Sequence, residues 1–297
     1  MEYCFVVNGR QDMAFILEKL RSQFDALGIA PRVYVTKGTG DATRFVRLYC
    51  EFHPEVKTCF VSCGGTGTAN EVASGLVGSK GNTFAVMAFG NTDDFTKCFP
   101  GRNFRSVADI LDGETVPLDV IRCNNDYAIN MINIGFDAAV SYEANRLVER
   151  GIRHNSYGKA IFGAIFLHRF NNLRIVVDGE RISRFTTLLC TVANGRYCGG
   201  EYLSAPNAKL DDGLMDVCLM RGMSLASFLH ILPKYKAGKH LEDRFSLRRL
   251  VYRQARRVEV SSRTIQYISL DGETVASTHF VIEILPKAIT IQLPVKK

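Results

Sequence analysis

Short apolar runs alternate with amphipathic stretches over the first 110 residues of the chain. The apolar runs predict strands at residues 4–7, 32–36, 57–62 and 84–89. Between them, apolar residues recur at helical spacing, which predicts helices at residues 15–27, 42–49 and 69–77. Strands that alternate with helices are typical of a mostly parallel sheet covered by helices, so this part is expected to be an α/β domain.

The pattern changes at Pro117 to many short strands. They are predicted at residues 118–122, 127–134, 173–177, 186–193, 215–220, 257–261, 265–270 and 278–285. Two helical inserts are expected within this part, over residues 138–170 and 224–238. The pattern favours an antiparallel second domain. We place the two domains at residues 1–115 and 116–285, and expect the tail 286–297 to return to the first.

Composition and motifs exclude several classes of protein. The chain has 297 residues, enough for about two domains, and no apolar run approaches the ~20 residues of a membrane span. The first residues lack the cationic segment of a signal peptide, so we expect a cytoplasmic protein. Among nine cysteines and six histidines there is no C-x-x-C or H-x-x-x-H spacing, which disfavours a zinc site. The G-x-S-x-G and Walker motifs are also absent, which disfavours serine hydrolases and P-loop NTPases.

Positive charge is concentrated in one late segment. The net charge is +7, and nine basic residues between 234 and 257 face only two acidic ones there. They are Lys234, Lys236, Lys239, Arg244, Arg248, Arg249, Arg253, Arg256 and Arg257. A solvated face explains this charge, and a surface that holds the protein near anionic lipid is the alternative. No nucleic-acid-binding motif accompanies it, so a nucleic acid partner is not expected.

A glycine-rich turn joins the third predicted strand to the next helix. Residues 63–68 read Cys-Gly-Gly-Thr-Gly-Thr, and such a turn leaves backbone N–H groups at a helix N-terminus free to bind phosphate. A capping box, with Thr68 as the cap and Glu71 reaching back, is an alternative for those two residues but leaves the three glycines unexplained. Asn70 stands where a dinucleotide fingerprint has its third glycine.

A second turn, residues 90–95, follows the next predicted strand and is expected at the same edge of the sheet. It carries the adjacent carboxylates Asp93 and Asp94, which could hold Mg²⁺ against phosphates. A helix N-terminus also favours aspartate for its own sake, so both explanations stay open.

The tripeptide Asp-Gly-Glu occurs three times, at residues 112–114, 178–180 and 271–273. Asp-Gly is a hairpin signal that needs no chemistry. Only the context of one copy could assign it a catalytic role.

Taken together, these motifs resemble the diacylglycerol kinase catalytic family, in particular the bacterial lipid kinases of the diacylglycerol and sphingosine kinase type. The likeness covers nearly the whole chain. The matching segments, in family order, are Thr36 with residues 40–42, then residues 63–72, 90–95, 117–119, 133–137, 199–200 with 205–206, 210–214 and 270–273.

The resemblance implies an NAD-kinase-like α/β domain, a mainly antiparallel β-sandwich and nucleotide in the cleft between them. It implies nucleotide-binding positions at Asn8, Thr36, Gly64, Gly65, Thr66, Gly67, Thr68, Asn70, Glu71 and Asn91. It implies that Glu273, assisted by Asp271, is the general base. A metal and phosphate region is expected at Asp93, Asp94, Lys97 and Asp119. A structural Mg²⁺ site is expected at Lys209, Asp212 and Leu214.

Three departures from the family all concern the nucleotide side. Thr66 replaces an aspartate, residues 91–93 read Asn-Thr-Asp where the family has T-x-N, and the opening segment 7–10 lacks a proline.

From the resemblance as a whole we predict an ATP- and Mg²⁺-dependent kinase of diacylglycerol or a related lipid, acting at a membrane surface. The alternative is a pseudokinase that binds nucleotide or lipid without transfer. An NAD kinase is disfavoured, and a homodimer is left open.

Overall fold

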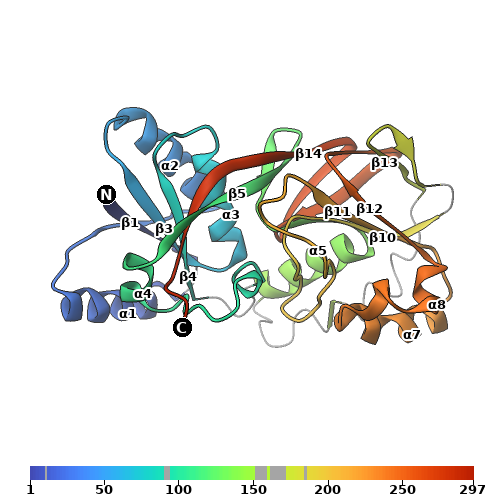
Figure 1. Ribbon diagram of the computed structural model, residues 1–297, viewed down its shortest axis with the longest axis horizontal. Helices are drawn as coiled ribbons and strands as arrows, with labels where there is room; N and C mark the ends of the chain where they lie inside the picture. Colours follow the sequence, from blue (N-terminus) through green and yellow to red (C-terminus); the bar gives the residue numbers. More distant parts are fainter. Residues whose placement is uncertain (11, 90–93, 151–158, 161–171, 184–185) are drawn as a thin grey trace. The chain divides into compact units, whose positions relative to one another are not determined.

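The structure is a computed structural model that describes residues 1–10, 12–89, 94–150, 159–160, 172–183 and 186–297. The chain forms two compact units (Figure 1). Unit 1 comprises Met1–Val120 and Pro286–Lys297, and unit 2 comprises Ile121–Leu285. No helix among these described residues is long and apolar enough to cross a membrane.

Unit 1 is the predicted α/β domain. Its parallel sheet has the order β4-β3-β1-β2, and the end of β14 lies parallel to β4 through Ile291 and Phe84. The elements of unit 1, in chain order, are β1 (Glu2–Val7), α1 (Met13–Leu27), β2 (Arg32–Val35), α2 (Asp41–Phe52), β3 (Thr58–Gly64), α3 (Thr66–Leu76), β4 (Thr83–Ala88), η1 (Thr96–Cys98) and α4 (Val107–Leu111).

Helices cover both faces of this sheet. Helices α1 and α4 pack on one face, where Leu20 and Ile110 meet strand residues such as Val61. Helices α2 and α3 lie side by side, and the Tyr49 ring of α2 packs edge-on against Phe60, with ring centroids 5.4 Å apart (Figure 1). Strands β3 and β4 are buried along their whole length. Such burial explains why they read as continuous apolar runs.

Unit 2 is mainly antiparallel, as expected. Its strands have the order β12-β11-β10-β7-β13-β14, and β8 pairs with β13. Strand β5 (Glu114–Cys123) runs from unit 1 into unit 2, and β14 (Glu273–Leu293) runs from unit 2 into unit 1. The other elements are β6 (Asp126–Ala128), β7 (Met131–Gly135), α5 (Phe136–Glu149), β8 (Arg174–Val177), β9 (Glu180–Arg181), β10 (Thr187–Ala193), β11 (Met215–Arg221), α7 (Leu225–Lys236), η2 (Lys239–Leu241), α8 (Arg244–Leu247), β12 (Leu250–Ala255) and β13 (Arg257–Leu270).

Several strand predictions in this unit are corrected. The single strand predicted at 127–134 is two strands, β6 and β7, that are separated at residues 129–130. The two strands predicted at 257–261 and 265–270 are one strand, β13, with a shift of register between Ser261 and Gln266. Strand β12 lies within the basic segment and was not predicted. Helix α5 falls in the first predicted insert, and residues 151–158 and 161–171 of that insert lie outside the described residues.

Candidate nucleotide and acceptor sites

The glycine-rich turn links the end of β3 directly to α3. Gly65 is the N-cap, in extended backbone with φ −96° and ψ −168°, and the helix begins at Thr66. A Cβ atom on Gly64 would lie 2.5 Å from Oγ1 of Thr68, so position 64 requires glycine for a close approach. The first turn of a helix has N–H groups without intrahelical acceptors and a partial positive charge. The end of β3 is therefore built to receive an anion such as phosphate.

Asn8 and Gly9, which directly follow β1, connect the ends of three strands through hydrogen bonds. Nδ2 of Asn8 donates to Oγ1 of Thr68 over 2.9 Å, and the backbone N–H of Asn8 donates to the carbonyl oxygen of Cys63 over 3.0 Å. The N–H of Gly9 donates to Oγ1 of Thr36 over 3.1 Å. The candidate nucleotide residues Asn8, Thr36 and Thr68 therefore form one network at the carboxyl edge of the sheet.

Gly9 lies at a close contact between the turns after β1 and β2. A Cβ atom on Gly9 would lie 2.1 Å from the carbonyl oxygen of Thr36. A larger residue would force the turns after β1 and β2 apart. Glycine at position 9 therefore permits the close contact that brings Thr36 next to the Asn8 turn.

The predicted capping box is wrong. The N-cap of α3 is Gly65, and Thr68 accepts from Asn8 instead of capping the helix. The two carboxylate oxygens of Glu71 accept the N–H groups of Gly40, over 2.9 Å, and Ala42, over 3.1 Å. Glu71 therefore holds the start of α2 against α3. The nearby Asn70 is buried on the same helix.

The turn that follows β2 is held by a buried carboxylate. Asp41 accepts hydrogen bonds from the N–H of Lys37 over 2.9 Å, from Arg44 over 2.9 Å and from the hydroxyl of Tyr34 over 2.8 Å. These donors, the Lys37 N–H foremost, lower the pKa of Asp41 below its usual value. The carboxylate therefore stays ionised and fixes the turn that carries Thr36.

The second turn is only partly described. Residues 90–93, which include the candidate residues Asn91 and Asp93, lie outside the described residues. Asp94 follows directly and is 8% exposed, and Phe95 packs against Phe84 and Phe99. Lys97 lies in the short helix η1. Asp94 thus sits on an anchored segment just after β4.

Asp119, expected near the metal, is fully buried on β5. Its Oδ1 accepts the N–H of Lys287 over 2.6 Å, and Lys287 has a positive φ of 50°. This carboxylate therefore stabilises the left-handed backbone at Lys287 within β14. Among the described residues, no three His, Cys, Asp or Glu side chains gather as a metal site. Mg²⁺ in kinases needs only one or two carboxylates besides phosphate oxygens, and Asp94 fits that requirement.

The three Asp-Gly-Glu copies have different structural roles. Asp112 is the C-cap of α4, so that copy is not a hairpin turn, and a Cβ on Gly113 would lie 1.9 Å from the carbonyl oxygen of Leu293. The other two copies are tight turns between strands, with positive φ at Asp178 (45°) and Asp271 (47°). Only the last two copies fit the hairpin expectation.

Asp271 is a buried clamp for the segment between β6 and β7. Its carboxylate accepts the N–H groups of Ile129 over 2.7 Å, Asn130 over 3.2 Å and Met131 over 2.8 Å. Its own N–H donates to the carbonyl oxygen of Met131 over 3.0 Å. Asp271 therefore positions the hairpin, whose next carboxylate, Glu273, is exposed at the start of β14.

Asp271→Asn is expected to lower the free energy of unfolding by about 2–4 kcal/mol, because an amide offers one acceptor oxygen to three N–H groups. Urea unfolding measures this loss. The matched control is Asp178→Asn in the exposed hairpin, where the carboxylate accepts the N–H groups of Arg256 and Arg257. A loss as large for the control would contradict the clamp.

The predicted structural metal residues lie in one turn before β11. The N–H of Leu214 donates to Oδ1 of Asp212 over 3.0 Å, and Lys209 precedes them in the same loop. Asp216 follows at 1% exposure and accepts from the hydroxyl of Tyr252. Burial raises the pKa of Asp216, and the Asp212 charge adds to this rise. Sequence reasoning missed Asp216, because nothing local marks it as buried.

Two family models cover nearly the whole chain. The diacylglycerol kinase catalytic domain matches residues 2–123, and the YegS C-terminal NAD kinase beta sandwich-like domain matches residues 130–293. The chain therefore belongs to the family of diacylglycerol kinases and YegS-like lipid kinases. This assignment confirms the resemblance and the two-domain fold, with a β-sandwich as its second part.

Individual relatives agree with this assignment. The diacylglycerol kinase of Bacillus subtilis (strain 168) is 26% identical over 271 residues, which is 90% of this chain and 86% of that protein. A protein named "Probable lipid kinase YegS-like" from Shewanella frigidimarina (strain NCIMB 400) is 28% identical over 242 residues, 78% of this chain and 75% of its own. A crystal structure of a diacylglycerol kinase from Bacillus anthracis (strain Sterne) shares the fold, with a TM-score of 0.68 at 21% identity, covering 98% of this chain and 96% of that one.

Proposed function

We propose that this chain transfers the γ-phosphoryl group of ATP to a hydroxyl group of diacylglycerol or a related lipid. The observation that carries the proposal is the network of Asn8, Thr36 and Thr68 around the glycine-rich turn, in a chain of the lipid kinase family. The network fixes the first turn of α3 at the carboxyl edge of the sheet, where ligands of open α/β sheets bind.

Each reacting group has an assigned residue. The triphosphate binds at the N-terminus of α3, and Glu273 accepts the proton of the lipid hydroxyl as its oxygen forms the new bond to the γ-phosphorus. The bond from that phosphorus to the bridging oxygen breaks, and ADP leaves. Mg²⁺, held by Asp94 together with phosphate oxygens, would neutralise the charge that develops on the leaving group.

Glu273 is favoured over the other two copies by its surroundings. Glu114 follows the C-cap of α4, and Glu180 follows a hairpin aspartate that is exposed. Glu273 instead follows the buried Asp271 clamp, which fixes the backbone from which its side chain projects. A positioned base needs no reorganisation at the moment of transfer.

The substitution at position 66 gives a test of whether this chain is an active enzyme. Threonine there offers one carboxylate fewer to Mg²⁺ than the family aspartate, and Asp93 is the additional carboxylate that would replace it. We expect an active wild type, strong impairment in Asp93→Asn and little gain in Thr66→Asp, because two nearby carboxylates repel each other.

An assay with radioactive ATP and lipid in mixed micelles measures phosphoryl transfer by the wild type and both variants in parallel. An inert wild type that gains activity on Thr66→Asp would show a pseudokinase.

The proposal also locates the reaction at the cytoplasmic surface of a membrane, since a diacylglycerol resides in the bilayer.

A further inference from the structure

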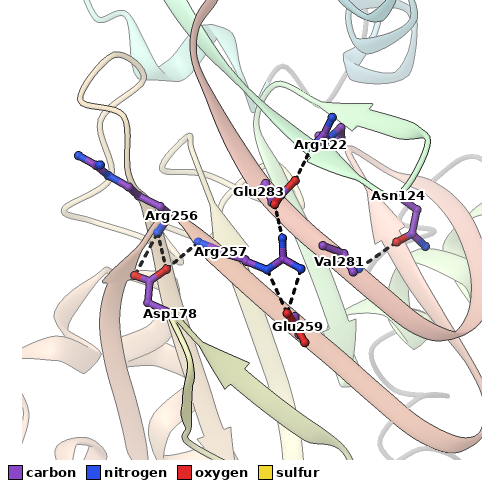
Figure 2. A network of polar contacts seen from close by, with 8 residues as sticks. All are labelled: Arg122, Asn124, Asp178, Arg256, Arg257, Glu259, Val281 and Glu283. Atoms are coloured by element: carbon purple, nitrogen blue, oxygen red, sulfur yellow. Dashed lines mark hydrogen bonds and ion pairs between the residues drawn. The ribbon is translucent and has the colours of Figure 1, made fainter.

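The basic segment 234–257 divides into two parts with different surroundings. At its end, the Arg257 guanidinium contacts the carboxylates of Glu259 and Glu283, and Glu283 also pairs with Arg122 (Figure 2). The carboxylate of Asp178 accepts the N–H groups at 256 and 257. The charge of Arg257 is therefore balanced within unit 2, so this side chain offers little attraction to an external anion.

The earlier part of the segment keeps an excess of positive charge. Residues 234–253 contain seven Lys or Arg and two Asp or Glu. Lys234 pairs with Asp243 over 2.7 Å, and Lys236 pairs with Glu201. Four further cations of this part are exposed: Lys239, Arg244, Arg248 and Arg253. Within the described part of the chain, no carboxylate lies at ion-pair distance from any of these four.

Helices α7 and α8, with the short helix η2 between them, form a preassembled pair that holds three of these cations: Lys239 on η2, Arg244 on α8 and Arg248 at the end of α8. They lie side by side (Figure 1), and the rings of His230 and Phe245 pack 4.8 Å apart between them. The Lys234–Asp243 ion pair also joins them, and the guanidinium of Arg249 lies 3.7 Å from the Phe245 ring centroid. The pair is therefore a rigid part of unit 2, with little ordering left to do on binding.

Each of the two helices also exposes a leucine. Leu229 of α7 is 49% exposed and Leu247 of α8 is 46% exposed, whereas Phe228 and Ile231 of α7 are buried against the unit. Exposed leucines beside unpaired arginines suit the boundary between lipid head groups and acyl chains. Nucleic acid would use the cations but would leave the leucines without a partner.

We propose that this α7–α8 face, made of Leu229, Lys239, Arg244, Leu247 and Arg248, docks on the surface of an anionic bilayer. The choice of a membrane as the partner rests on the proposed function, because the acceptor lipid resides there. The cations attract anionic head groups and the leucines enter the interface.

Vesicle sedimentation tests the proposal with the full chain. The wild type is expected to bind phosphatidylcholine vesicles that contain phosphatidylglycerol, to bind pure phosphatidylcholine weakly, and to dissociate as salt rises. Arg244→Gln with Arg248→Gln should weaken partitioning about 25-fold, at roughly fivefold for each cation removed. Leu229→Ser with Leu247→Ser should weaken it about tenfold.

The matched control removes two exposed arginines from helices of unit 1, by Arg21→Gln with Arg47→Gln, and should leave partitioning unchanged. Equal loss in the control, indifference to lipid charge, or binding to duplex DNA in preference to vesicles would overturn the proposal. Phosphotransfer in neutral mixed micelles should be unaffected by the surface variants. Vesicle binding without any lipid kinase activity would refute the proposed function and leave the docking face standing.

Discussion

Glu273→Gln is expected to lower the turnover of lipid phosphorylation by about 10²–10⁴-fold, the range typical of a lost general base. Glutamine keeps the size of the side chain but cannot accept the hydroxyl proton. Affinity for ATP should stay nearly unchanged, because the residues proposed to bind nucleotide belong to unit 1. Steady-state kinetics with varied ATP and lipid separates these two effects.

Glu180→Gln is the matched control for this variant. Glu180 is the third residue of a hairpin with the same Asp-Gly-Glu sequence and the same positive φ at its aspartate, 45° at Asp178 against 47° at Asp271. The control should retain wild-type turnover. If both variants lose activity equally, Glu273 has no special role.

Gly65→Val is expected to abolish the rise in melting temperature that ATP produces. The backbone at Gly65 is extended, so valine can adopt it, but the added side chain would stand at the N-cap, where we propose that phosphate approaches α3. The apo protein should therefore melt within a few degrees of the wild type. Thermal shift measured with and without ATP and Mg²⁺ tests this, and a retained ATP shift would move nucleotide binding elsewhere.

Gly64→Ala provides a contrast at the neighbouring position. Its Cβ would lie 2.5 Å from Oγ1 of Thr68 and 3.2 Å from Cβ of Asn8, so it should disturb the network itself. This variant is expected to lose both stability and ATP binding. The pair therefore separates the shape of the turn from access to it.

The α/β part of the fold could be read from the sequence because its strands are buried on both faces. Strands such as β3 and β4 are continuous apolar runs, and the helices between them have one apolar face. Strand β12 was missed because it has a mixed pattern, in which Arg253 and Gln254 are exposed and only its ends are buried. Its pairing with β11 is a tertiary contact that local pattern cannot reveal.

Motifs could nominate the candidate site residues, but they could not identify the hydrogen-bond partners of those residues. Thr68 and Glu71 have capping-box spacing, yet their partners are Asn8 and the turn at Gly40, which are 60 and 31 residues away in the chain. The clamp of Asp271 on residues 129–131 spans about 140 residues. These long-range hydrogen bonds arise only when strands are set side by side, so the local pattern could not distinguish the three Asp-Gly-Glu copies, and only the resemblance to the family singled out the third.

The most direct test of the proposed function is transfer of radioactive phosphate from γ-labelled ATP to diacylglycerol by the wild-type chain in mixed micelles with Mg²⁺. Thin-layer separation of the lipid products measures the result. We predict labelled phosphatidic acid that forms with time, requires Mg²⁺ and is nearly lost with Glu273→Gln. No labelled lipid from diacylglycerol or related acceptor lipids, by protein that is folded and binds ATP, would contradict the account.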